Sequence, residues 1–295
     1  MIELFRALAT FTERPRSEHA RLSRELGLPS VPTDDEYTEL FVLQLYPYAS
    51  VYVGAEGMLG GEARDRIAGF WRAIGDVPPK EPDHLAVLLA LYARLGELER
   101  DESRPERATA WRRARIAFLH EHLLSWLPAY LDKLIEIAPP VYRAWGRLLE
   151  EALRSAAREL SGTERLPLHL RDAPPLASSG GEAATNLAEA VLVPVRSGLI
   201  VTRVDLSRGA RALGLGLRIG ERRFALDGLL SQDREAVLGW LEGEAARWYV
   251  RHEAMREEFG DIAVFWADRA GQTRALLVRA RERVLAGAAT AEVSK

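Results

Sequence analysis

Apolar residues recur three and four positions apart along most of this chain, the spacing that places side chains on one face of an α-helix. After Pro82 the apolar set is Leu85, Leu88, Leu89, Tyr92 and Leu95. The same spacing predicts further helices over 2–11, 118–135, 142–153, 202–213, 231–252 and 261–286. Short strands are compatible only with 191–201, where a proline and a glycine disfavour them. We therefore predict an all-α fold, a helical bundle.

Prolines and capping residues mark where several of these helices begin and end. Pro128 interrupts one apolar stripe, and Pro139-Pro140 closes it, because proline cannot continue a helix. Asp83 stands where an N-cap or first-turn acid belongs. Thr202 can cap the helix that follows it, and that helix is expected to end at Gly214.

One segment lacks any helical period and predicts a division of the chain. Residues 161–186 are rich in proline, glycine, serine and alanine, which is typical of a linker. It separates a predicted domain over 1–160 from a C-terminal, mainly helical region over 187–295. The pattern gives this second region no function.

The composition excludes several kinds of chemistry. None of the 295 residues is cysteine, which removes disulfides, thiolate metal sites and cysteine nucleophiles, and fits a reducing compartment. The formal net charge of −3 provides no general attraction to nucleic acid or membrane. None of the three lysines follows a glycine run, so a Walker-type phosphate loop is missing. No G-x-S-x-G occurs, which leaves a hydrolase without support.

The sequence also predicts where the protein works. The start of the chain has no basic stretch followed by an apolar one, so it does not resemble a secretory signal. No apolar run approaches the roughly 20 residues that span a bilayer. We expect a cytoplasmic protein without stable membrane insertion.

Two further motifs have simpler explanations than the ones they suggest. His120-Glu121-His122 begins like a zinc-protease helix, but residues two apart on a helix point to different sides, so surface or capping histidines are expected rather than a metal site. The segment 192–223 has a net charge of +5, and all of its basic residues are arginines. With the glycine turn at 214–220 it suggests a DNA-binding regulator that uses 192–230, although the second segment is mostly apolar.

The region 41–84 is the most informative part of the chain. Two aromatic, glycine- and proline-rich loops flank one arginine-rich helix and are too apolar for simple linkers. The net charge over 76–106 is −4. Exposed aromatic rings beside carboxylates would suit a ligand that has an apolar run next to arginines. On the residues alone, a loop capped by Asp83 with His84 packed in the next turn explains the region equally well.

A family resemblance favours the first explanation. The segments 45–52 (LYPYASVY), 56–61 (EGMLGG) and 81–84 (EPDH) resemble successive motifs of the TorD/DmsD/NarJ family of molybdoenzyme chaperones. The similarity extends over 36–155, through Trp126-Leu127-Pro128 and Tyr142-Arg143-Ala144. Members of this family commonly have about 200 residues, so the part after 186 is an addition to the shared core.

The resemblance implies a TorD-like helical bundle that is not an enzyme and has no cofactor, with weak guanine-nucleotide binding known in some relatives. It implies binding of the twin-arginine signal peptide, or of the apo form, of a molybdopterin oxidoreductase catalytic subunit before cofactor insertion and export. The chain itself would be a monomer or dimer without a nucleic-acid partner. The binding residues expected from the matching motifs are Tyr46, Pro47, Tyr48, Ser50, Tyr52, Glu56, Trp71, Glu81, Pro82, Asp83 and His84.

A mechanism follows for these residues. The arginines of the peptide would contact Glu81 and Asp83, and its apolar stretch would pack on Tyr46, Tyr48, Tyr52 and Trp71. Alanine at Asp83 or His84 should then weaken peptide binding and leave melting nearly unchanged. A hydrolase acting through Asp83 and His84 is the least favoured alternative, because no nucleophile or second acid lies nearby in the sequence.

Overall fold

The computed structural model describes residues 2–158, 165–176 and 189–293. Contacts divide the chain into an N-terminal unit, Met1–Asp172, and a C-terminal unit, Ala173–Lys295. The division falls inside the segment predicted as a linker. Of that segment, 161–164 and 177–186 lie outside the described residues, and the described part contains helix α10 (Leu168–Arg171).

Helices and the loops that join them make up the described part of the N-terminal unit. Its elements are α1 (Ile2–Thr10), α2 (Glu18–Glu25), α3 (Asp34–Tyr37), η1 (Thr38–Gln44), α4 (Ala49–Val53), α5 (Gly61–Ala73), α6 (Leu85–Asp101), α7 (Pro105–Phe118), η2 (Leu119–Leu124), α8 (Leu127–Ile137), α9 (Pro140–Ala157) and α10. The segments η1 and η2 are π-helical and continue α3 and α7 without a break. The predicted all-α class is confirmed.

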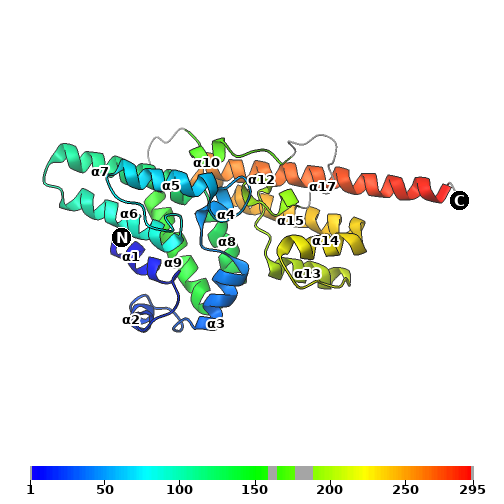
Figure 1. Ribbon diagram of the computed structural model, residues 1–295, viewed down its shortest axis with the longest axis horizontal. Helices are drawn as coiled ribbons and strands as arrows, with labels where there is room; N and C mark the ends of the chain where they lie inside the picture. The colour runs from blue at the N-terminus through cyan, green and yellow to red at the C-terminus, as the bar shows by residue number, and fades with distance from the viewer. Residues whose placement is uncertain (1, 159–164, 177–188, 294–295) are drawn as a thin grey trace. The chain divides into compact units, whose positions relative to one another are not determined.

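The helix α6 is the centre of the N-terminal unit. It packs against α1 on one side and α7 on another, and α8 pairs with α9; Figure 1 shows α6 and α7 lying side by side. The indoles of Trp126 and Trp145 are fully buried and donate hydrogen bonds to the backbone oxygens of His122 (2.9 Å) and Leu8 (3.0 Å). Burying large side chains in this way, with their polar atoms paired, contributes about 1.5–3 kcal/mol each.

The prolines begin helices where the sequence predicts. Pro128 lies in the first turn of α8 and Pro140 opens α9, positions at which the missing proline N–H costs no helical hydrogen bond. The apolar stripe over 118–135 is therefore divided among the end of α7, the π-helical η2 and α8.

The paired histidines on η2 correct one prediction. His120 and His122, expected on the surface or at a cap, are only 7% and 8% exposed. His122 Nδ1 lies 3.3 Å from Nε2 of His169 on α10, within a cluster that includes the rings of Phe70 and Phe118. The π-helical turn changes the angular spacing of its residues, so the α-helical geometry assumed from the sequence does not apply here.

The C-terminal unit is also built from helices. They are α12 (Pro194–Ser197), α13 (Arg203–Leu213), α14 (Arg222–Gln232), α15 (Arg234–Ala254), α16 (Arg256–Phe259) and α17 (Asp261–Val293). Thr202 caps α13 with a capping box, and Gly214 ends it in the left-handed conformation, both as predicted. The strands considered for 191–201 do not form: this segment holds α12 and irregular backbone.

The long pair α15 and α17 forms the core of the C-terminal unit. Trp248 stacks on His252 at 5.1 Å between ring centroids, and the ring of Trp266 lies 5.9 Å from the same imidazole. His252 Nε2 is 2.9 Å from the backbone oxygen of Gly198. Gly198 has φ +74° and approaches α17 so closely that a Cβ would lie 2.4 Å from the Ala270 nitrogen, which requires glycine there. Within the described ranges, no helix is both long and apolar enough to cross a bilayer.

Candidate functional site

Two segments about 35 residues apart in the sequence are joined by backbone hydrogen bonds in the N-terminal unit. The Ala49 N–H donates to the Asp83 oxygen (3.0 Å), and the Leu85 N–H donates to the Pro47 oxygen (2.8 Å). Between them Tyr48 and His84 form an isolated antiparallel bridge. The start of α6 is thereby attached to the loop before α4, which brings the LYPYASVY and EPDH motifs together.

The buried Asp83 carboxylate strengthens this connection. Asp83 and Ser50 are 2% and 0% exposed. The Ser50 hydroxyl donates to Asp83 Oδ2 at 2.6 Å, and the Ser50 N–H approaches the same oxygen at 3.3 Å. The Gly60 N–H in turn donates to Ser50 Oγ at 3.1 Å. One carboxylate thus holds the start of α4 directly and the loop 54–60 through Ser50.

His84, rather than Asp83, is the N-cap of α6, so that part of the sequence prediction is wrong. The Ala86 N–H donates to His84 Nδ1 at 3.2 Å, which requires that this nitrogen carry no proton. Burial lowers the pKa of His84, outweighing the raising effect of Glu81, and keeps the imidazole in the neutral form that can accept. Asp83 lies one residue earlier and faces Ser50 instead.

Glu81 is the exposed carboxylate of the EPDH motif. It accepts a hydrogen bond from the Tyr48 hydroxyl at 2.9 Å. Burial and this contact with Glu81 raise the pKa of Tyr48, so the phenol remains a donor at neutral pH. The Tyr48 ring also meets His84 edge to face at 4.8 Å between centroids.

The remaining predicted residues do not form one open aromatic groove. Tyr52 is 3% exposed, stacks on Trp126 at 5.2 Å and donates its hydroxyl to the Tyr46 oxygen at 2.9 Å. Tyr52 therefore belongs to the core, because its ring has no free face for a ligand. Among the described residues, neither Glu56, which is exposed, nor Trp71, which is half-buried on α5, hydrogen-bonds with Asp83 or Ser50. Pro47 and Pro82 are buried at the junction.

Comparison with known proteins shows what the N-terminal unit is similar to. Residues 19–132 match the family model described as nitrate reductase delta subunit. Chaperone protein TorD of Vibrio vulnificus (strain YJ016) is 35% identical over 98 residues, which cover 30% of this chain and 44% of that relative. The N-terminal unit is similar to the TorD/NarJ family over these residues. Two other TorD relatives are similar: that of Photobacterium profundum is 33% identical over 88 residues (28% of this chain, 41% of the relative), and that of Shewanella amazonensis 31% over 140 residues (36% and 55%).

The match to the TorD/NarJ family is partial on both sides. This chain spans about half the length of the curated relatives it matches. The family model ends at residue 132, well before the C-terminal unit begins at Ala173.

Near the junction, the exposed apolar side chains are not among the site residues predicted from the sequence. Met58 and Leu59 are 66% and 58% exposed in the loop that Gly60 ties to Ser50. Val77 is 87% exposed in the loop that leads to Glu81, and Arg64 on α5 donates to the Lys80 oxygen of that loop at 3.0 Å. The sequence does hold a signal for Met58 and Leu59: two apolar residues followed directly by two glycines are not part of a helical face that could bury them.

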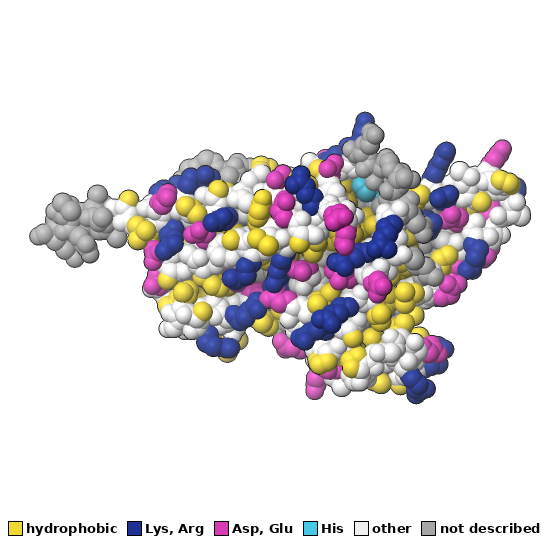
Figure 2. All heavy atoms as spheres, turned by 180° about the vertical axis from the view of Figure 1, so that it is seen from behind, with side chains coloured by type: hydrophobic (Ala, Val, Ile, Leu, Met, Phe, Trp, Pro, Cys, Tyr) yellow, Lys and Arg dark blue, Asp and Glu magenta, His cyan; other side chains and the backbone are white. Residues whose placement is uncertain are grey.

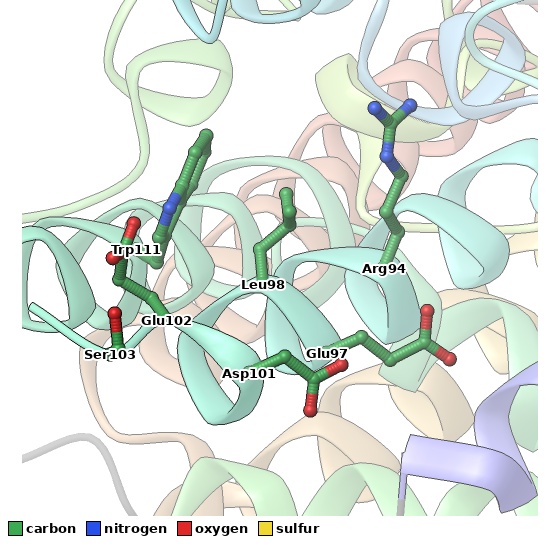
Figure 3. Close-up of a pocket in the computed structure, with 7 residues that line it drawn as sticks. All are labelled: Arg94, Glu97, Leu98, Asp101, Glu102, Ser103 and Trp111. Carbon is green, nitrogen blue, oxygen red and sulfur yellow. The ribbon is translucent and has the colours of Figure 1, made fainter.

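A concavity of the N-terminal unit lies between α6 and α7. It has a volume of about 390 Å³, and Figure 3 shows Leu98 and Trp111 projecting to one side while Glu97 and Asp101 project to another. Each of its three carboxylates, including Glu102, has an arginine within 3.5 Å. Three arginines from outside 76–106 (Arg6, Arg107 and Arg115) pair with Glu97, Glu102 and Glu99 and offset most of the net negative charge counted over that segment, away from the Asp83 junction.

The arginines of 192–230 do not assemble into one basic surface. Arg208 pairs with Asp205, Arg223 with Glu189 at 2.7 Å, and Arg222 donates to the Val201 oxygen at 2.8 Å. On the face shown in Figure 2, positive and negative side chains are interspersed. Among the described side chains, no three potential ligands gather as a metal site.

Proposed function

We propose that this chain is a cytoplasmic chaperone that assists the maturation of a molybdopterin oxidoreductase. It would bind the catalytic subunit before cofactor insertion, through the twin-arginine signal peptide or another apolar segment of the apo-protein. The similarity to TorD chaperones supports this class of function and a role without catalysis. A DNA-binding regulator is not favoured, because the relatives are chaperones.

The observation that carries the proposal is the junction formed by Ser50, Asp83 and Gly60. It fixes the bases of two loops whose tips are apolar and exposed, at Met58 and Leu59 and at Val77. Exposed methionine adapts to varied apolar sequences, a property suited to signal peptides. The rigid base with an apolar tip therefore favours binding of an apolar segment over catalysis.

Glu81 and Glu56 are the carboxylates available to the arginines of such a peptide. Both are exposed, whereas Asp83 is 2% exposed and already accepts from Ser50. We assign Asp83 to positioning the loops and Glu81 to direct contact with the peptide. An arginine that binds Glu81 would compete with the Tyr48 hydroxyl for the same oxygen.

Replacing both Met58 and Leu59 by aspartate should weaken peptide binding at least tenfold. Each side chain loses its burial against the ligand, on the order of 1.5–3 kcal/mol if burial is complete. The probe is a fluorescent synthetic peptide with two consecutive arginines followed by an apolar stretch, and anisotropy measures its affinity. Because both side chains are exposed in the free protein, thermal melting should hardly change.

Val31→Asp is the matched control, since Val31 is an apolar residue of the same unit that is 45% exposed outside the two loops. It should bind the peptide as the wild type does. A peptide with both arginines replaced by glutamine separates charge recognition from apolar recognition. Equal affinity of the wild type and the Met58/Leu59 variant would refute this location of the site.

A further inference from the structure

The connection between α13 and α14 in the C-terminal unit exposes an unusual set of apolar side chains. Ile219 is 97% exposed, Phe224 50% and Leu217 39%. They lie within eight consecutive positions, and the segment that connects α13 to α14 runs along α14 from Gln232 back toward Phe224. We name residues 214–224 the α13–α14 tip.

The α13–α14 tip is held in place by specific contacts. Gln232 at the end of α14 donates to the Gly216 oxygen at 2.7 Å, and its own Oε1 accepts from the Gly216 N–H at 2.8 Å. The same amide group donates to the Gly228 oxygen at 2.8 Å. Gly214 adopts the left-handed conformation that ends α13, and Leu215 N–H returns to the Ala210 oxygen. These hydrogen bonds from Gln232 hold Gly216 in place, and Gly216 directly precedes the segment that carries Leu217 and Ile219.

Arginines lie near these apolar side chains in the sequence, and Arg218 also lies near one of them in space. Arg211 and Arg218 are exposed, and within the described residues neither has an ion pair with a carboxylate. The Arg218 guanidinium lies 5.5 Å from the centre of the Phe224 ring. Glu221 is the one carboxylate in the sequence of the tip. Exposed apolar side chains accompanied by exposed arginines are typical of a segment that inserts shallowly among anionic headgroups.

We propose that the α13–α14 tip binds the surface of membranes that contain anionic lipids. Ile219, Leu217 and Phe224 would enter the boundary between headgroups and acyl chains, and Arg211 and Arg218 would contact lipid phosphates. Three exposed apolar side chains on one short segment suit a deformable bilayer, whereas a rigid protein partner would need to offer a matching pocket. Nucleic acid would gain nothing from the exposed isoleucine. The binding is peripheral and independent of the client-binding site.

The first test is sedimentation of the full-length protein with vesicles. It should bind vesicles of phosphatidylglycerol and phosphatidylcholine in equal parts, and bind pure phosphatidylcholine much more weakly. Ile219→Asp should lower the partition coefficient at least tenfold, and Arg211→Gln and Arg218→Gln about fivefold each. Higher salt should weaken binding by screening the arginines. Leu285→Asp, at another exposed apolar residue of the same unit (51% exposed), should have no effect.

The second test reports insertion directly. Because the chain has no cysteine, Ile219→Cys labelled with an environment-sensitive fluorophore gives a signal from the tip alone, and Leu285→Cys is its control. Anionic vesicles should shift the emission of the Ile219→Cys label to the blue and leave the control unchanged. Soluble glycerol phosphate should neither shift it nor compete, which separates a lipid surface from free phosphate.

The proposal fails if the labelled tip stays in a polar environment on anionic vesicles, or if Ile219→Asp and Leu285→Asp sediment alike. It also fails if the tip binds duplex DNA or an acidic protein and leaves the vesicles unbound. Peptide binding at the N-terminal unit should be unchanged in the Ile219 variants. The proposal on membrane binding is therefore tested independently of the proposal on peptide binding.

Discussion

Acidification from pH 7.5 to 4.5 should lower the free energy of unfolding by several kcal/mol through three buried histidines. Burial lowers the pKa of His122 to about 3 and those of His169 and His252 to about 4, well below the usual value near 6.5. Below pH 6.5 the unfolded chain takes up protons that the folded chain does not. The stability is therefore complete above pH 6.5 and declines as the pH falls toward 4, by about 2–3 kcal/mol for each histidine at pH 4.5.

His122→Phe should remove the share of this acid sensitivity that belongs to His122. Phenylalanine suits the position, because the rings of Phe70 and Phe118 already pack around it. Urea unfolding of the full chain at both pH values gives the measured quantity, the difference in unfolding free energy between pH 7.5 and pH 4.5. That difference should shrink by about 2–3 kcal/mol relative to the wild type.

Phe118→Leu provides the comparison, since it disturbs the same cluster without removing a titrating group. It should lower stability by a similar amount at both pH values and leave the difference between them unchanged. If His122→Phe retained the full acid sensitivity of the wild type, the carboxylates of the chain would be its source instead.

The helices were predictable because local signals agree with the packing. Leucine and tryptophan recur at helical spacing where α6 and α15 are buried, and Thr202 and Gly214 supply the caps that limit α13. The burial of His122 could not be predicted in this way. It depends on a π-helical turn and on His169 of α10, 47 residues further along. Neither leaves a periodic pattern in the sequence.

The candidate site was predictable in its position and only partly in its roles. The family motifs locate the two segments that the Tyr48–His84 bridge joins. Motif residues can serve either a ligand or the fold, and the sequence does not say which. Asp83 and Tyr52 are buried and hold the fold together, whereas exposure singles out Met58 and Glu81 as residues a ligand could contact.

That distinction makes the Asp83→Ala variant decisive, and it reverses the expectation from the sequence alone. The carboxylate accepts the hydroxyl of Ser50, which is fully buried. Alanine would leave that hydroxyl without its acceptor and release the attachment of the loop 54–60. A hydrogen bond to a charged group contributes about 1.5–3 kcal/mol, and an unsatisfied buried donor adds to the loss. We expect Asp83→Ala to lower the free energy of unfolding by about 2–4 kcal/mol.

Glu81→Ala is the matched control, two residues away with an exposed carboxylate. It loses one hydrogen bond from Tyr48, so its stability should fall by at most about 1 kcal/mol, while peptide affinity falls because the arginine contact is removed. Ser50→Ala, alone and combined with Asp83→Ala, completes a double-mutant cycle in urea unfolding, and the two losses should be far from additive. Additive losses, or wild-type stability of Asp83→Ala, would show that the carboxylate does not hold the loops. Asp83 would then return to the set of residues available for direct contact with the client.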